Sequence, residues 1–172
     1  MSFCFYKAKL VTLECSMLKI LSLHIVLFSC FAALAQFSED FSDGEYTSDP
    51  IWSGDTDKFV IVDNRLRSNH APSSTESYYL STVSSISYDA TWEFYIELDL
   101  STSGLNYVDI FLVADRLDLV NAQDGYCIRV GDTSEEIILY KLSNGEKYVL
   151  IDDNVRRVDG STNNIFKIRV SR

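Results

Sequence analysis

The chain has 172 residues, of which 25 are acidic and 15 basic, so its formal net charge is −10. This length is typical of a single domain. The acidic excess argues against nucleic acid and anionic membrane surfaces as partners, because proteins bind both through basic side chains.

The first 35 residues read as a secretory signal peptide. An apolar run over residues 20–35 follows Lys19 and ends in the small-residue site Ala33-Leu34-Ala35. The run is shorter than the ~20 apolar residues of a membrane-spanning helix, and its basic start and small-residue end are typical of a signal that is removed. We predict cleavage before Gln36, which leaves residues 36–172 as one domain.

Three details of the leader qualify this prediction. Met17 begins a compact signal by itself, so residues 1–16 read as an over-extended start. A retained membrane anchor is one alternative, and lipidation at Cys30 is another. Once the signal is cleaved, we expect a secreted or cell-surface protein with no membrane attachment and a net charge of about −12.

The predicted mature domain holds one cysteine and one histidine, Cys127 and His70. An internal disulfide is therefore excluded. Cys127 alternates with apolar neighbours, which favours a buried thiol over a nucleophile.

The pattern along the mature domain is that of an all-β protein. Short segments with period-two alternation recur, and no long run has the apolar spacing of a helix. After an aromatic-punctuated opening loop over residues 37–54, we predict about nine strands. They are Lys58–Val62, Arg65–Asn69, Ser77–Thr82, Ala90–Leu100, Tyr107–Ala114, Gly125–Val130, Glu136–Leu142, Lys147–Ile151 and Ile165–Val170.

Residues 90–100 give the clearest strand signal. Successive side chains of a strand point to opposite faces, so one face carries Trp92, Phe94, Ile96, Leu98 and Leu100 and the other carries Glu93, Tyr95, Glu97 and Asp99. Tyr107–Ala114 is apolar on both faces, which predicts a central strand. Asn144-Gly145 tolerates positive φ at both positions and predicts a tight hairpin. Strands at this spacing are typical of an antiparallel two-sheet sandwich or a barrel, and we favour the sandwich.

Glu93, Glu97 and Asp99 are the candidate catalytic residues. Residues two apart on a strand lie about 6.6–6.8 Å apart, so their carboxylates fall in the range that paired acids of glycoside hydrolases use. Their spacing does not reproduce the Glu-x-Asp-x-Glu pattern of sandwich glucanases, which favours a solvated strand face instead.

Tyr95, flanked by Glu93 and Glu97, is the candidate ligand-binding residue. Sugar rings stack on aromatic faces while polar groups fix their orientation. Aromatic pairing that only stabilises the sheet is the alternative. Asp55 and Asp57 are candidate metal ligands, since their oxygens suit calcium, although no EF-hand loop occurs and ordinary turns use the same residues.

A set of turn and core motifs resembles a known family. The motifs are Phe41-Ser42-Asp43-Gly44, Trp52–Phe59, Ser77–Thr82, Trp92-Glu93-Phe94 and Gly125–Gly131. They are similar to the N-terminal module of large secreted surface proteins of Bacteroidota, which often carry lamin-tail or sorting domains downstream. The resemblance covers nearly all of the mature domain. It implies a concanavalin A-like (laminin G-like) jelly roll and a secreted accessory role, with no catalytic residues to carry over.

In those relatives further strands and domains follow the last strand that matches, whereas this sequence ends at Arg172. The resemblance thus implies a C-terminally truncated sandwich, a fragment, or a chain that a partner completes. We hypothesise a non-enzymatic module that binds polysaccharide. The alternatives are a glycoside hydrolase or lyase that uses the acidic strand face, and a structural or adhesive domain whose partner is a surface protein.

Overall fold

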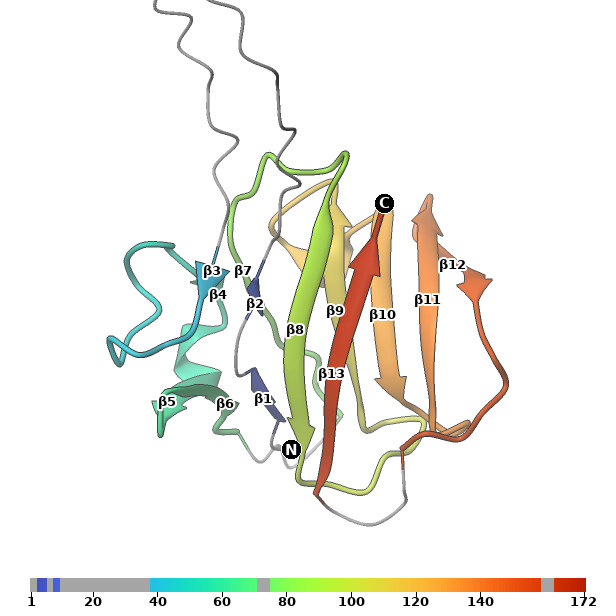
Figure 1. Ribbon diagram of the computed structural model, residues 1–172, viewed down its shortest axis with the longest axis horizontal. Coiled ribbons are helices and arrows are strands. Elements are labelled where there is room, and N and C mark those ends of the chain that lie inside the picture. The colour runs from blue at the N-terminus through green and yellow to red at the C-terminus, as the bar shows by residue number, and fades with distance from the viewer. Residues whose placement is uncertain (1–2, 6–7, 10–37, 71–74, 159–162) are drawn as a thin grey trace, which may run out of the picture.

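The computed structural model describes residues 3–5, 8–9, 38–70, 75–158 and 163–172 (Figure 1). These residues form antiparallel β-sheets without an α-helix, as the alternation predicts. Two short 3-10 helices, η1 (Thr56–Lys58) and η2 (Leu119–Asn121), interrupt the loops. Within the described part of the chain, no helix has the length and apolar character needed to cross a membrane.

The larger sheet has five strands in the order β13-β8-β1-β6-β5. The first of these in the sequence, β1, lies within the predicted signal peptide and pairs with both β6 and β8. The strands are β1 (Phe3–Phe5), β5 (Phe59–Val62), β6 (Arg65–Ser68), β8 (Thr91–Leu98) and β13 (Asn164–Ser171).

The second sheet has four strands in the order β12-β11-β10-β9, each hairpin-connected to the next. Its strands are β9 (Tyr107–Ala114), β10 (Gly125–Gly131), β11 (Glu136–Ser143) and β12 (Glu146–Ile151). Two further pairs are small: β2 (Ala8–Lys9) with β3 (Ser38–Glu39), and β4 (Ser53–Gly54) with β7 (Leu80–Ser81).

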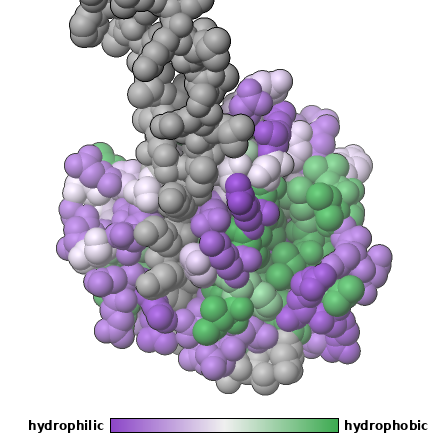
Figure 2. All heavy atoms as spheres, viewed as in Figure 1, coloured by the Kyte–Doolittle hydropathy of each residue, from purple (hydrophilic) through white to green (hydrophobic). Residues whose placement is uncertain are grey.

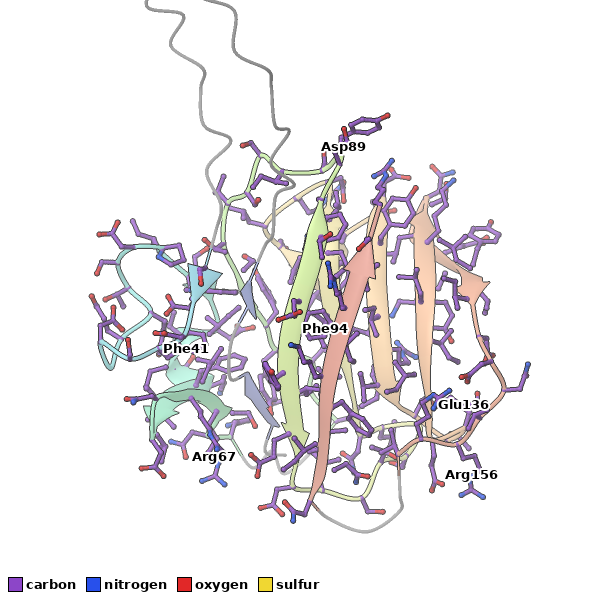
Figure 3. The ribbon with its side chains drawn as sticks, in the orientation of Figure 1. Phe41, Arg67, Asp89, Phe94, Glu136 and Arg156 are labelled. Atoms are coloured by element: carbon purple, nitrogen blue, oxygen red, sulfur yellow. The ribbon has the colours of Figure 1, made fainter. Side chains whose placement is uncertain are left out.

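The alternation predicted for residues 90–100 is confirmed over β8. Phe94, Ile96 and Leu98 are buried, whereas Glu93, Tyr95 and Glu97 are only half-buried on the opposite face. Figure 3 labels Phe94 midway along this strand. A one-residue slip would place the polar set in the core, so burial of the three apolar side chains fixes the register.

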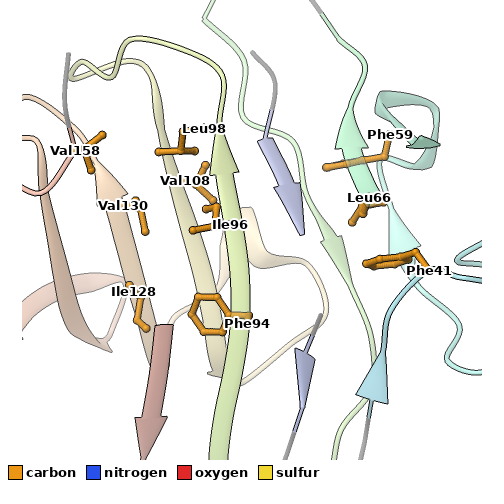
Figure 4. Close-up of a cluster of buried hydrophobic side chains, with 10 residues drawn as sticks. All are labelled: Phe41, Phe59, Leu66, Phe94, Ile96, Leu98, Val108, Ile128, Val130 and Val158. Atoms are coloured by element: carbon orange, nitrogen blue, oxygen red, sulfur yellow. The ribbon is translucent and has the colours of Figure 1, made fainter. Parts of the chain in front are cut away.

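One hydrophobic cluster receives side chains from both larger sheets. Phe94, Ile96 and Leu98 of β8 pack in it with Val108, Ile128 and Val130 of β9 and β10 (Figure 4). Burial of each such side chain contributes about 1.5–3 kcal/mol. The face of each sheet that carries these residues is called its inner face below, and the opposite face its outer face.

The opening loop is pinned by aromatic side chains, as predicted. Phe41 is buried in the main cluster, and its ring lies 6.3 Å from that of Trp52. The hydroxyl of Tyr46 donates a hydrogen bond to the carbonyl oxygen of Thr56 at 2.9 Å. Phe37, the fourth aromatic residue of the predicted loop, lies outside the described residues.

The hairpin predicted at Asn144-Gly145 joins β11 to β12. Asn144 has a φ of 51° and Gly145 a φ of 79°, which is the positive-φ pair of a two-residue turn. Beyond β12 the chain returns to the start of β11, where the N–H groups of Arg157 and Val158 both donate to the carbonyl oxygen of Glu135. Glu136 and Arg156 mark this end of the sheet in Figure 3.

Two predictions about strands are wrong. Tyr107–Ala114 forms β9, but it is the last strand of its sheet rather than a central one. Its outer face is only partly apolar. Phe111 packs there against Cys127 and Leu142 in a second cluster, whereas Asp109 on the same face bonds to Arg129.

The segment Ser77–Thr82 is strand only at Leu80–Ser81. Ahead of it, the N–H of Tyr79 donates to the Asp55 carboxylate at 2.9 Å, and the N–H of Asp55 donates to the carbonyl oxygen of Tyr79 at 2.9 Å. Asp55 thus bonds to the backbone of Tyr79 where a partner strand would otherwise do so. The alternation of residues 77–82 alone does not predict this arrangement.

Candidate functional site

The candidate residues Glu93, Tyr95 and Glu97 share the outer face of β8, and each lies beside a cation. Lys167 Nζ on β13 lies 3.0 Å from Glu93 Oε1 and 5.3 Å from the centroid of the Tyr95 ring. Arg65 Nη1 on β6 lies 2.7 Å from Glu97 Oε2. The hydrogen bond that Lys167 donates to Glu93 raises the pKa of Lys167 above its usual value.

The structure therefore brings these three residues together as a charge-paired strand face. Asp99, the remaining catalytic candidate, follows the end of β8 and is exposed. Ion pairs at such half-exposed positions are worth about 0–1 kcal/mol each.

Asp55 and Asp57, the candidate metal ligands, have separate roles. Asp55 accepts the hydrogen bond from Tyr79 described above, and Asp57 lies 3.4 Å from Lys58 Nζ in an exposed ion pair. Among the residues that the structure describes, no group of three or more His, Cys, Asp or Glu residues has the arrangement of a metal site.

In the other acidic turns, aspartate side chains accept hydrogen bonds from nearby backbone N–H groups. Asp115 accepts hydrogen bonds from the N–H groups of Gln123 and Asp124, and Arg116 lowers the pKa of its carboxyl to about 2. The N–H of Asn154 donates to Asp152 at 2.7 Å. These contacts are those of turn-forming aspartates.

Cys127 and His70 lie in different surroundings. Cys127 is a free, fully buried thiol in the second cluster, and burial raises its pKa to about 11. His70 lies 2.7 Å from Glu76 and stands edge-on to the Tyr78 ring at 5.7 Å. A thiol with a raised pKa is a poor nucleophile.

A cluster on the outer face of the four-stranded sheet is not among the sites that the sequence predicts. Arg129 on β10 pairs directly with Asp109 on β9. Its Nε and Nη2 groups donate to the two oxygens of Asp109 at 2.8 and 2.9 Å, which is a bidentate geometry. Arg129 Nη1 donates to Asp132 at 2.7 Å, and Lys147 on β12 also donates to Asp109.

Two tyrosine rings flank these charges. The guanidinium of Arg129 stacks on Tyr107 at 3.7 Å from the ring centroid. Tyr140 on β11 lies with its ring centroid 5.9 Å from both Arg129 and Lys147. We call these six residues the Arg129 cluster; they are Tyr107, Asp109, Arg129, Asp132, Tyr140 and Lys147.

The electrostatics of the cluster are those of fixed, mutually compensating charges. Burial raises the pKa of Asp109, but the hydrogen bonds and charges of Arg129 and Lys147 outweigh it, so the pKa lies below its ordinary value. The side chains of Asp109 and Arg129 are 18% and 15% exposed, so both still reach the surface. An arginine has five N–H donors, and the bonds to Asp109 and Asp132 occupy three of them.

A sequence signal for this cluster exists. Asp109 interrupts the apolar run of β9, and Arg129 interrupts that of β10. A charged residue in the middle of an apolar strand needs a partner, but only the strand register shows that these two residues stand opposite each other.

No family model, no curated protein and no solved structure matches this chain.

Proposed function

We propose that this chain is an exported, non-enzymatic β-sandwich module that binds neutral polysaccharide on the Arg129 cluster. The sandwich is supported by the shared core of the two larger sheets, to which β8 contributes from one side and β9 and β10 from the other. The jelly-roll arrangement that the sequence motifs imply is part of the same proposal.

The observation that carries the binding proposal is the combination of tyrosine rings and rigid polar groups on one sheet face. Sugar-binding sites use aromatic faces for the apolar side of a pyranose and a few well-placed polar groups for its hydroxyls. The bidentate pair of Arg129 and Asp109 holds its donors and acceptors in place before a ligand arrives, which lowers the entropic cost of binding.

The charges favour a neutral ligand over an acidic one. Arg129 and Lys147 are balanced by Asp109 and Asp132, so the cluster carries no net positive charge. The chain as a whole has a net charge of −10, which repels anionic polysaccharides.

The enzymatic alternative has less support. A glycosidase needs one carboxyl group that gives a proton and another that stays ionised. On β8 each candidate carboxylate lies in an ion pair, Glu93 with Lys167 and Glu97 with Arg65. The outer face of β8 thus holds two carboxylates in similar surroundings.

A glycan array that includes neutral polysaccharides tests the proposal. We expect binding by the wild-type protein, a loss of about 2- to 10-fold in affinity for Tyr140→Ala, and no change for Tyr95→Ala, because a contact with an aromatic ring is worth about 0.5–1.5 kcal/mol. Tyr95 is the matched control, since it is also a half-buried tyrosine beside a lysine. Failure to bind any polysaccharide, or a loss with Tyr95→Ala alone, would contradict the proposal.

Export is tested by the intact mass of the protein recovered from a secreting host. We expect a chain that begins at Gln36, which lacks β1 and β2. A mass that includes residues 1–35 would show that the leader is retained and that β1 stays available to pair with β6 and β8.

A further inference from the structure

The strand position between β6 and β8, which we call the β1 position, is filled from the predicted leader. The other four strands of this sheet lie in the predicted mature domain. Residues 3–5 enter the sheet antiparallel to both neighbours. Phe5 stands opposite Leu66 of β6 on one side and opposite Ile96 of β8 on the other. A segment far away in the sequence thus supplies the middle strand of the five-stranded sheet.

Without β1, the facing edges of β6 and β8 lose their shared backbone partner. Neighbouring strands of a sheet lie about 4.7–4.9 Å apart, so one strand's width separates β6 from β8 and keeps them from bonding to each other. Their opposite edges are already paired with β5 and β13. Backbone N–H and C=O groups that lose a partner must find another in water or in a new strand.

The β1 position lies over the main hydrophobic cluster. Leu66, Ile96 and Leu98 are only 0–1% exposed. In Figure 4 the blue strand β1 runs between Leu66 on one side and Ile96 and Leu98 on the other. An empty position would let water reach these side chains, which is unfavourable. The core therefore favours an occupied position over an open one.

The chemistry of the position matches that of the N-terminal segment. Figure 2 shows mostly hydrophilic surface on the side of the molecule where Figure 1 places β5 and β6. A strand with one buried and one wet face carries apolar residues two apart, as Phe3 and Phe5 are. Residues 1–9 also hold two lysines and no acidic residue, whereas the predicted mature domain has a net charge of about −12 and attracts a basic segment.

We propose that the β1 position is a strand-acceptor site whose occupant is this chain's own N-terminal segment. β2 strengthens its binding, because Ala8 and Lys9 pair with Glu39 and Ser38 of β3. The five-stranded sheet is then complete only while this segment is bound, and loss of the leader opens the site. The proposal does not depend on the polysaccharide ligand, since the Arg129 cluster lies on the other sheet.

A cut in the leader tests whether strand pairing alone holds β1. A protease site is placed within residues 10–19 of the full chain, which is produced without export, and the cut protein is passed over a size-exclusion column. We expect the N-terminal fragment to stay with the domain at about 10 µM. Cys4→Pro should release it, because proline lacks the N–H that a middle strand donates. Ser2→Pro, one residue ahead of β1, is the matched control and should retain the fragment.

Hydrogen exchange of the same proteins distinguishes an open site from a failure to fold. After the cut, backbone amides of β6 and β8 should exchange at least ~10-fold faster in Cys4→Pro than in the wild type, while those of β10 stay protected in both. Unchanged protection of β6 and β8 after release of the fragment would show that the sheet closes by itself, which overturns the proposal.

Competition with a synthetic peptide of residues 1–9 needs no variant. Excess peptide should displace the fragment from the cut wild type and leave β6 and β8 protected. Spontaneous release of the wild-type fragment, its retention against excess peptide, or equal retention in Cys4→Pro would contradict the proposal, even if a strand of another protein enters the site.

Discussion

Asp109 accepts hydrogen bonds from both Arg129 and Lys147 while it lies in the middle of an apolar strand. Its ion pair with Arg129 is the least exposed of those in the described residues. The surface pair of Asp57 and Lys58 differs, because the side chain of Asp57 is 76% exposed. Water screens the exposed pair, whereas the loss of Asp109 leaves two cations without their main partner.

Replacement of Asp109 by alanine should therefore lower the free energy of unfolding by about 3 kcal/mol, as expected for breaking a largely buried charge pair. Urea unfolding monitored by circular dichroism measures this change. Asp57→Ala is the control and should change the stability by less than ~0.5 kcal/mol. Equal effects of the two substitutions would show that the Arg129 cluster makes no special contribution.

We also expect Asp109 to make the stability of the protein depend on pH. The pKa of Asp109 in the folded protein lies below the ordinary aspartate value of 3.8, which applies to the unfolded chain. Its stabilisation is therefore complete above about pH 4 and is lost as the pH falls through the lower, folded-state pKa. The free energy of unfolding should drop in this acidic range less steeply in Asp109→Asn than in the wild type. Parallel profiles for the two proteins would contradict this account.

At the scale of the elements, local patterns determine most of the strands. Alternation in residues 90–100 predicts β8 and its faces, and Asn144-Gly145 predicts the β11–β12 turn. The place of β9 and the Arg129 cluster could not be predicted in this way. Both depend on which strands become neighbours, and a period-two pattern carries no information about pairing.

The two faces of β8 should respond differently to truncation. Ile96 is fully buried, so Ile96→Ala should cost about 2–5 kcal/mol through lost burial and the cavity that remains. Tyr95 next to it is half-buried on the outer face, and Tyr95→Ala should cost less than ~1 kcal/mol. Thermal or urea unfolding compares the two variants, and a larger cost for Tyr95→Ala would mean that the faces are assigned the wrong way round.

The β11–β12 turn depends on its glycine. Gly145 has a φ of 79°, and an added Cβ would come within 3.0 Å of the Gln123 side chain. Gly145→Ala should therefore cost about 1–2 kcal/mol in unfolding free energy. Asn144→Gly, at the neighbouring positive φ, should stay within ~0.5 kcal/mol. Equal stability of wild type and Gly145→Ala would argue that the turn relaxes without strain.

At the scale of the whole molecule, the two larger sheets have different outer faces. That of β8 and β13 carries separate ion pairs such as Glu93 with Lys167. That of the four-stranded sheet carries one connected set of rings and charges around Arg129. Connected, fixed groups are suited to a ligand. The sequence predicts Tyr95 on the other sheet instead, because the alternation of apolar and polar residues is most regular in residues 90–100.

Hydroxyl-radical footprinting of the protein, free and with a polysaccharide that it retains, tests the location of binding most directly. We predict that the ligand protects Tyr107 and Tyr140 while the reactivity of Tyr95 stays the same. Protection confined to Tyr95 and its neighbours on β8, or unchanged reactivity of all three tyrosines, would contradict the assignment of the Arg129 cluster as the binding surface.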